Sequence, residues 1–367
     1  MRQSGGGAEV FQTSLVLLLA LVRRVQEEVE LPAWRKQLPT PSNLSLDEVQ
    51  SICRKAHFAF ATYSASWSSS EEEVAKQMGV DQENVVLTWC RDEEDTGLCP
   101  KFIVLMDHES KAVVLAIRGT FCLRDVLLDM VCDDAPFLDG FAHKGIREGA
   151  EAVWAASCPA LLSALALHPS YHLHLTGHSL GAGVAVLLAL ELLLGDGATT
   201  LPPGTEVHCL ALAPPPVFRA GPDPLPPWVV QQVVEVVHHR DCVPRTSLAG
   251  LATMLATLRA VDSLQLSFKE IVSALGAEGG EVRSRVVEAL EELQEKEPLP
   301  LLQHPGRLLY LEEEDGEGWT VRELSQSGLG QLMVVAGMVT DHSKEGYEEA
   351  LAGLKDSVIQ KEIKRNH

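Results

Sequence analysis

The chain has 367 residues and a formal net charge of −21 at pH 7. This charge excludes nucleic acid as the expected partner, because phosphate backbones are bound by clustered Lys and Arg, and it also disfavours anionic membrane surfaces. Hydrophobic residues make up 46% of the chain and charged residues 22%, which is ordinary for a globular protein. No apolar run approaches the length needed to cross a bilayer, so we expect no transmembrane segment. The oligomeric state is left open.

The N-terminal part of the chain predicts a helix followed by a linker. Leu15–Val22 is an apolar stretch followed at once by Arg23 and Arg24, whereas a cleavable signal peptide carries its positive charge before the apolar stretch. Two interpretations remain open, an amphipathic helix packed on the domain and an interfacial membrane anchor. Pro32–Leu46 has the composition of a linker, so we expect residues 1–45 to precede the main domain.

The 8 cysteines are scattered along the chain without a compact pattern, and several lie in apolar segments where a thiol packs as a small hydrophobic group. This usage favours a reducing compartment, so we expect a cytoplasmic protein that is at most peripherally bound to a membrane. No two cysteines have the CxxC spacing of a zinc site. We therefore expect no metal.

The elements predicted before residue 170 are a helix, three strands and a second helix. In chain order they cover Ser45–Tyr63, Val85–Cys90, Phe102–Asp107, Val113–Arg118 and Ala142–His168. The second and third strands are separated by a loop short enough for a hairpin. We expect the second helix to be broken around Cys158 and Pro159.

From residue 171 onward, short buried strands alternate with helices. The predicted strands are Tyr171–Thr176, Val207–Ala213, Val229–Val237 and Arg307–Leu311, and the predicted helices are Ala182–Leu194 and Glu345–Lys355. This alternation is typical of a mainly parallel sheet with helices on both faces, so residues 46–367 are expected to form one α/β domain. Residues 246–305 depart from this plan and predict a helical insertion, with helices at Leu248–Leu264, Phe268–Leu275 and Val282–Leu293.

Ser179 is the centre of the segment Gly177–His178–Ser179–Leu180–Gly181, which joins a predicted strand to a predicted helix. Hydrolases of the α/β-hydrolase fold place the nucleophilic serine on such a turn, where a glycine two residues to either side relieves crowding. A serine that only caps the following helix is the alternative. Because the first N–H groups of a helix stabilise negative charge, the Leu180 N–H is the expected first oxyanion donor.

In this fold class the acid and the histidine follow the serine, so the candidates can be eliminated in chain order. Asp241 comes after the strand Val229–Val237, and acids at strand ends are favoured because the carboxyl ends of parallel strands carry the site. His304 lies at the start of a strand, which is the wrong end, and His367 is the last residue. His342 precedes a helix, and its loop can reach over the sheet. We therefore expect His342 as general base and Asp241 as its partner.

Thr120 follows the end of a predicted strand and is the candidate second oxyanion donor, through its N–H and its hydroxyl. An ordinary turn at the strand end is the alternative. An apolar stripe at helical spacing comes next, formed by Leu123, Val126, Leu127 and Met130. Such a stripe is typical of a lid helix that opens on lipid, and equally of a helix that faces the core.

Five segments in this order resemble the class 3 lipases, which include fungal triacylglycerol lipases and diacylglycerol lipases of animals and plants. The segments are Ile117–Thr120, Ala142–Gly145, Thr176–Ala182, Asp241–Arg245 and Asp341–His342, within a resemblance that covers roughly Phe102 to Leu354. It implies the α/β-hydrolase fold, a triad of Ser179, Asp241 and His342, oxyanion donors at Thr120 and Leu180, and a lid after Thr120.

The diacylglycerol lipase subgroup is the most similar, because of the segment His143–Gly145 and the long insertion between the acid and the histidine. Animal members of that subgroup begin with a transmembrane bundle, for which this sequence offers no suitable segment. We expect a serine lipase that hydrolyses an ester of a diacylglycerol or monoacylglycerol at a membrane or droplet surface, through an acyl-Ser179 intermediate and without a cofactor. A phospholipase A or a soluble-ester esterase would use the same triad, whereas a lipase-like signalling scaffold would keep the fold without turnover.

Overall fold

The computed structural model of the chain describes residues 13–66, 68, 70–89, 99–120, 134–195, 200–246, 248–276, 279–294, 302–314, 316, 318–326, 328–329 and 332–365. The chain divides into two compact units. The helical unit comprises Met1–Gln37, Ala249–Pro300 and Leu332–Ala336, and the sheet unit comprises Leu38–Leu248, Leu301–Gln331 and Gly337–His367. Each unit has an apolar core of its own.

The helical unit joins the N-terminal helix to the predicted insertion. Its helices are α1 (Leu15–Val25), which continues through a π-helical turn (Gln26–Glu30) into α2 (Leu31–Arg35), and α9 (Leu248–Ser263), α10 (Phe268–Leu275) and α11 (Gly280–Gln294). Ser267 and Glu270 form a capping box that begins α10. Apolar side chains at helical spacing form the core, and include Leu18, Leu21, Val22, Val25, Leu258, Val261, Ile271, Ala274, Val286 and Leu290.

Side chains of the apolar stretch Leu15–Val22 form part of this core. Leu18, Leu21 and Val22 are at most 1% exposed and pack with the insertion helices, whereas Leu15 and Val16 are 46% and 73% exposed. The chain after α1 is held by two side chains of the π-helical turn, because Gln26 accepts a hydrogen bond from the Val334 N–H and Glu27 accepts one from the Ala336 N–H. The partnership between α1 and the insertion could not be read from the sequence, because these segments lie more than 200 residues apart.

The sheet unit is built around an eight-stranded sheet with the order β1-β2-β3-β6-β7-β9-β10-β11. These strands are β1 (Val85–Trp89), β2 (Phe102–Asp107), β3 (Ala112–Ile117), β6 (His172–His178), β7 (Val207–Leu212), β9 (Val233–His238), β10 (Arg307–Glu314) and β11 (Gly318–Leu324). β3, β6, β7, β9 and β10 are parallel, and the pairs β1–β2, β2–β3 and β10–β11 are antiparallel. A second, three-stranded antiparallel sheet joins β4 (Asp134–Phe137), β5 (Gly140–His143) and β8 (Phe218–Arg219).

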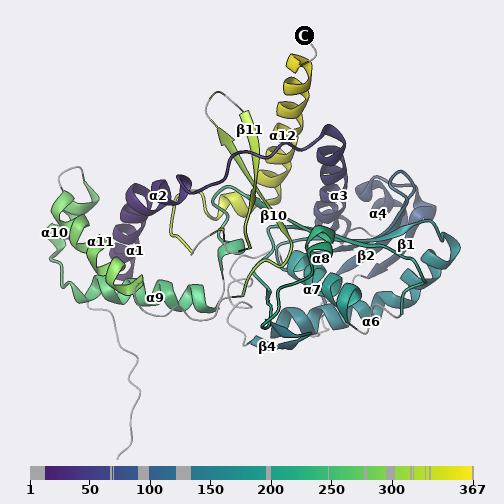
Figure 1. Cartoon of the computed structure of the whole chain (residues 1–367), viewed down its shortest axis with the longest axis horizontal. Coiled ribbons are helices and arrows are strands. Elements are labelled where there is room, and N and C mark those ends of the chain that lie inside the picture. Colours follow the sequence, from purple (N-terminus) through teal and green to yellow (C-terminus); the bar gives the residue numbers. More distant parts are fainter. Residues whose placement is uncertain are drawn as a thin grey trace, which may run out of the picture. The chain divides into compact units, whose positions relative to one another are not determined.

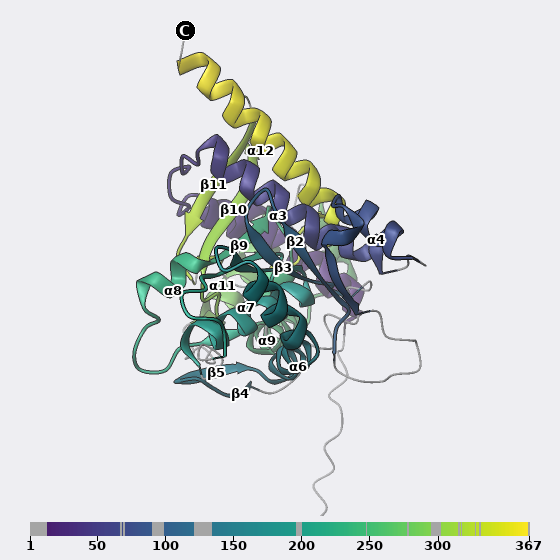
Figure 2. The ribbon, with the colours of Figure 1, turned by 90° about the vertical axis from the view of Figure 1, so that its right-hand side faces the viewer.

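Helices cover both faces of the large sheet (Figures 1 and 2). One face carries α3 (Leu46–Ala65), α4 (Glu71–Met78) and α12 (Lys344–Arg365), and the other carries α6 (Lys144–Leu167), α7 (Leu180–Leu194) and α8 (Pro227–Gln232). Because both faces are covered, a central strand must be apolar on both sides, and every residue of β3 is apolar and buried. The prediction of a mainly parallel sheet between two layers of helices is confirmed.

α6 is the one described helix that is long and apolar enough to cross a membrane, judged by length and composition alone. Its buried residues, among them Ile146, Val153 and Leu161, belong to the same apolar core as α7. The helix runs unbroken through Pro159, where we expected a break. Pro159 and Ala155 both lie on its exposed side, so water can reach the carbonyl that proline leaves without a donor.

The stretch Val229–Val237, predicted as one strand, is instead the end of α8 followed by β9. Val229 is already in the helix, and the strand begins at Val233. A short run of valines has no period that separates a helix from a strand, and the prolines at 226 and 227 are the signal for the helix start.

The acidic run after Tyr310 belongs to a hairpin of which the sequence predicted only the first strand. Glu312 and Glu314 lie on β10 and both pair with Arg322 of β11, with Arg322 Nε 2.7 Å from Glu312 Oε1. Glu312 is 6% exposed, so its charge is paired within the hairpin instead of facing solvent. The acidic side chains hide the alternation that would otherwise indicate a strand.

Histidines at alternate positions of β6 face the layer that contains α3. His174 is 1% exposed, and burial followed by the charge of Lys55 lowers its pKa well below 6.5. Burial and the neighbouring His208 lower the pKa of His172 to about 4. These side chains are therefore neutral in the folded protein at neutral pH.

We predict that His174 makes the folded protein less stable as the pH falls. Below pH 6.5 the unfolded chain protonates His174 and the folded chain does not. The free energy of unfolding therefore decreases by about 1.4 kcal/mol per pH unit from this residue. His174→Leu should remove this contribution, and His172→Leu should act in the same direction down to about pH 4. Urea unfolding at several pH values measures the slope, and equal slopes for wild type and His174→Leu would contradict the prediction.

Candidate active site

Ser179 lies on a tight turn between β6 and α7. Its backbone has φ 59° and ψ −128°, a conformation that is rare for a residue with a side chain and that is found at sites under functional constraint. Gly177 and Gly181 are required by close packing. A Cβ on Gly177 would lie 2.5 Å from the Gly181 carbonyl carbon, and a Cβ on Gly181 would lie 2.4 Å from the Ile117 oxygen. The first turn of α7 can approach β3 this closely only because both residues are glycine.

The structure brings His342 and Asp241 next to Ser179. His342 belongs to the 3-10 turn Thr340–His342 just before α12, and Asp241 follows β9. The distance from His342 Nε2 to Ser179 Oγ is 2.9 Å, and the distances from His342 Nδ1 to both carboxylate oxygens of Asp241 are 3.0 Å. The carboxylate can only accept, so Nδ1 carries a proton and Nε2 is free to accept the proton of Ser179. Ser179 and Asp241 are at most 1% exposed.

Two further groups hold the Asp241 carboxylate. The Tyr347 hydroxyl of α12 donates to Oδ2 at 2.8 Å, and the Val243 N–H donates to Oδ1 at 2.9 Å. Burial, followed by the charge of Asp241, raises the pKa of Tyr347 well above its usual value, so its hydroxyl stays protonated as a donor. The same hydroxyl accepts a hydrogen bond from the His238 N–H at 2.9 Å. Tyr347 was missed by sequence reasoning, because a tyrosine one turn into a helix carries no motif.

The loop that carries His342 is fastened to the loop that carries Asp241. The Asp341 carboxylate is 3.1 Å from His239 Nδ1 and accepts from the Arg240 N–H at 3.0 Å. Arg245 is buried on the other side and donates to the main-chain oxygen of Asp241 at 2.7 Å. Asp341 is thus bonded to the acid loop, and Asp241 alone of these two acids reaches the imidazole of His342.

His178 supports the histidine loop from the other side. Its ring stacks on that of His342, with centroids 5.0 Å apart and an interplanar angle of 28°. Its Nε2–H donates to the His342 carbonyl at 3.1 Å, so its Nδ1 accepts from the Tyr63 hydroxyl at 2.9 Å. Burial, followed by the charge of His342, holds the pKa of His178 well below 6.5. A neutral ring therefore lies beside His342.

The chain after β3 passes against the turn that carries Ser179. A Cβ on Gly119 would lie 3.2 Å from Ser179 Cβ and 2.4 Å from the His178 carbonyl oxygen. Thr120 follows directly, and its hydroxyl oxygen is buried without a hydrogen-bond partner in the described part of the chain. The Leu180 N–H belongs to the first turn of α7, where an α-helix leaves its N–H groups free. Thr120 and Leu180 are thus on the two segments that meet at Ser179.

The comparison with known families finds a match over the part of the chain that carries this site. The family described as Lipase (class 3) matches residues 114–251, which contain most of β3, the turn at Ser179 and Asp241. Over these residues the chain is similar to the class 3 lipases. This match confirms the resemblance inferred from the sequence segments.

Two curated proteins with lipase names are similar to part of this chain. Mouse diacylglycerol lipase-beta is 34% identical over 158 residues, which cover 41% of this chain and 22% of that protein. The secreted mono- and diacylglycerol lipase A of Penicillium cyclopium is 30% identical over 153 residues, which cover 40% of this chain and 47% of that protein. The matched part spans less than half of the length of either relative.

Solved lipase structures share the fold of this chain. A triacylglycerol lipase described as having a serine protease triad as its catalytic centre gives a TM-score of 0.52 at 15% identity, covering 81% of this chain and 93% of that one. A deletion mutant of Rhizomucor miehei lipase in complex with its propeptide gives 0.51 at 15% identity, covering 84% of this chain and 80% of that one. The predicted α/β-hydrolase fold is confirmed by these likenesses, which at this identity concern the fold alone.

The predicted lid residues Leu123, Val126, Leu127 and Met130 lie outside the residues that the structure describes. Within the described residues, no group of three or more His, Cys, Asp or Glu side chains is arranged to hold a metal ion.

We predict that Gly181→Ala destabilises the class 3 lipase fold at this turn. The added Cβ would meet the backbone of Ile117 and Arg118 at 2.4–2.9 Å, so α7 must move away from β3. Overpacking of this kind costs about 1–3 kcal/mol of unfolding free energy. Gly280→Ala is the matched control, since a Cβ there meets nothing within 4 Å. Thermal unfolding followed by circular dichroism compares the two variants, and an unchanged melting temperature for Gly181→Ala would contradict the prediction.

Proposed function

We propose that this protein is a serine lipase that hydrolyses a carboxylic ester of an acylglycerol through an acyl-Ser179 intermediate. The hydrogen-bonded series Ser179, His342 and Asp241 is the observation that carries the proposal. Its side chains have the donor and acceptor roles that nucleophilic acyl transfer requires. The match of residues 114–251 to the class 3 lipases supports the same reaction.

In the first half of the proposed reaction, Ser179 Oγ attacks the ester carbonyl carbon while its proton passes to His342 Nε2. The carbonyl oxygen becomes an oxyanion, for which the N–H groups of Leu180 and Thr120 and the Thr120 hydroxyl are the proposed donors. The carbon–oxygen bond to the alcohol then breaks, and the proton on Nε2 goes to the leaving alcohol. Asp241 stabilises the imidazolium through the Nδ1–H throughout this step.

In the second half, water attacks the acyl carbon of the acyl-Ser179 ester. His342 Nε2 takes a proton from the water, and the carbon–Oγ bond breaks as Ser179 regains a proton from Nε2. The products are a fatty acid and the alcohol released in the first half. Because Tyr347 and the Val243 N–H fix the carboxylate of Asp241, the imidazole keeps one orientation through both halves.

For the substrate, we propose a diacylglycerol or a monoacylglycerol. Both curated relatives described above are named for diacylglycerols, and the fungal one also for monoacylglycerols. We further propose that the protein works in the cytoplasm at a membrane or droplet surface, where such esters accumulate. Phospholipase A activity and soluble-ester activity are outcomes that the substrate panel below separates.

Ser179→Ala is expected to abolish hydrolysis, because the reaction then has no nucleophile. The measurement is release of fatty acid from a panel of monoacylglycerol, diacylglycerol, triacylglycerol, phospholipid and a short soluble ester, with wild type and variant side by side. We expect the highest turnover by wild type on diacylglycerol or monoacylglycerol, and at least about a 10³-fold loss in the variant. A fluorophosphonate probe should label wild type and not the variant.

Three results would contradict this proposal in different ways. Activity of Ser179→Ala near that of wild type would remove the nucleophile from the mechanism. A preference for the phospholipid or the soluble ester would change the substrate class and keep the mechanism. Wild-type protein that neither turns over any ester nor reacts with the probe would identify a scaffold without activity.

Thr120→Val is expected to slow turnover by about 10²–10³-fold with little change in KM, because the hydroxyl would act only on the oxyanion of the transition state. Thr88→Val on β1 is the matched control, since its hydroxyl oxygen is also buried without a partner in the described part of the chain. Initial rates on the best substrate of the panel measure the effect. Equal rates for the two variants would exclude the Thr120 hydroxyl as a donor to the oxyanion.

A further inference from the structure

A cavity of about 390 Å³ lies in the sheet unit between α3 and the sheet. Its volume is within the range of small-molecule sites, about 300–1,000 Å³. None of the three residues of the candidate triad lines it. One wall is apolar and comprises Leu44, Ile52, Leu210, Val234 and Leu309. The polar part of the wall contains Lys55 of α3 and His174 and His208, which are register partners on β6 and β7.

His174 is the least satisfied polar side chain of this wall. It is 1% exposed, and neither of its ring nitrogens has a hydrogen-bond partner within the described residues. A buried polar group without a partner destabilises the folded state, because it has lost its hydrogen bonds to water. A ligand that accepts a hydrogen bond from this imidazole would remove part of that cost. His208 is already engaged, because its Nε2 is 3.3 Å from Glu206 Oε2.

Lys55 adds a positive charge that forms no ion pair within the described residues. Its side chain is half-buried. Burial lowers its pKa, and the charge of Asp107, which raises the pKa, offsets this effect only in part. An anion placed between Lys55 and His174 would be held by a charge-assisted hydrogen bond and by the imidazole N–H.

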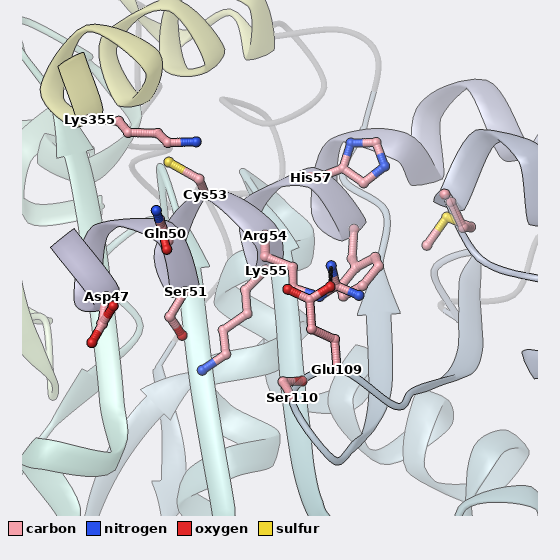
Figure 3. A pocket seen from close by; sticks show the side chains of 13 residues that line it. Asp47, Gln50, Ser51, Cys53, Arg54, Lys55, His57, Glu109, Ser110 and Lys355 are labelled. Atoms are coloured by element: carbon pink, nitrogen blue, oxygen red, sulfur yellow. Dashed lines mark ion pairs between the residues drawn. The ribbon is translucent and has the colours of Figure 1, made fainter. Parts of the chain in front are cut away.

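A neighbouring cavity, also lined by residues of α3, contains a cation that is already paired (Figure 3). That cavity of about 610 Å³ is also lined by Lys55, together with Arg54, Glu109 and Lys355. Its cation Arg54 is already paired, because its guanidinium lies 2.6 Å from Asp107 Oδ1 and 2.5 Å from Glu109 Oε2. Arg54 is therefore already neutralised, whereas Lys55, which lines both cavities, has no ion pair within the described residues.

The other charged residues of the cavity favour a ligand with one negative charge over a ligand with several. Asp47 and Glu48 line the same cavity and would repel a multiply charged phosphate. Arg307 also lines it, but its guanidinium is 2.8 Å from Glu323 Oε2 and 3.9 Å from Glu48 Oε1. A carboxylate with a hydrocarbon chain matches one unpaired ammonium, one unpaired imidazole and an apolar wall.

We propose that this cavity is a noncatalytic binding site for an aliphatic carboxylate, with the carboxylate at Lys55 and His174 and the chain along the apolar wall. A fatty acid is also a product of the proposed reaction, but the binding requires no hydrolysis. Binding is therefore tested in the Ser179→Ala variant, where the result does not depend on the proposed function.

Isothermal titration calorimetry of the full chain with decanoate, below its micelle concentration, tests the proposal. We expect one binding site in Ser179→Ala and an affinity at least about tenfold weaker once Lys55→Gln is added, because a charge-assisted hydrogen bond is lost. Lys355→Gln is the matched control, since it removes the same charge from the neighbouring cavity only. Acetate and decanol should both bind more weakly than decanoate, because each lacks half of the proposed contacts.

Several results would overturn the proposal. These are no decanoate binding, equal affinities of Lys55→Gln and Lys355→Gln, or decanol binding as tightly as decanoate. Circular dichroism checks that the variants fold. If Lys55→Gln does not fold, His174→Leu replaces it, and undiminished decanoate binding by that variant would equally overturn the site.

Discussion

The contact between the first turn of α7 and the end of β3 is the constraint on which the rest of the site depends. The backbone of Gly181 lies so close to Ile117 and Arg118 that no side chain fits between them. This contact fixes where α7 starts and forces Ser179 into a backbone conformation with positive φ. It also brings Gly119 and Thr120 against Ser179, so that one packing contact sets both the position of the hydroxyl and that of the groups around it.

The second requirement is that the buried carboxylate of Asp241 receive hydrogen bonds, in a protein with a net charge of −21. Asp241 is 0% exposed, and its oxygens receive hydrogen bonds from His342, Tyr347 and the Val243 N–H. Burying a carboxylate without such donors would cost free energy, because the charged group would lose its hydration without compensation. Tyr347 supplies one of these hydrogen bonds without adding charge, because its hydroxyl stays protonated. The buried guanidinium of Arg245 lies close by and donates to the main-chain oxygen of Asp241.

The sequence predicted those parts of the molecule that are encoded by local patterns. The glycines around Ser179 and the alternation of strands and helices are local, and chain order led to Asp241 and His342, which the structure places beside Ser179. Tyr63 and Tyr347 could not be found in this way, because each contributes a hydroxyl across a tertiary contact to a residue more than 100 positions away. The β10–β11 hairpin was missed because paired charges at Glu312 and Arg322 conceal its alternation.

The distance in sequence between Ser179 and His342 affects when their hydrogen bond can form during synthesis. The hydrogen bond from Ser179 to His342 joins residues 163 positions apart, whereas β3, β6, α7 and the glycines between them are neighbours in sequence. Contacts of long sequence separation form late in folding, because loop closure must precede them. During synthesis the turn at Ser179 emerges long before the segment that carries His342. The hydrogen bond between the two residues can therefore form only after that segment has been synthesised.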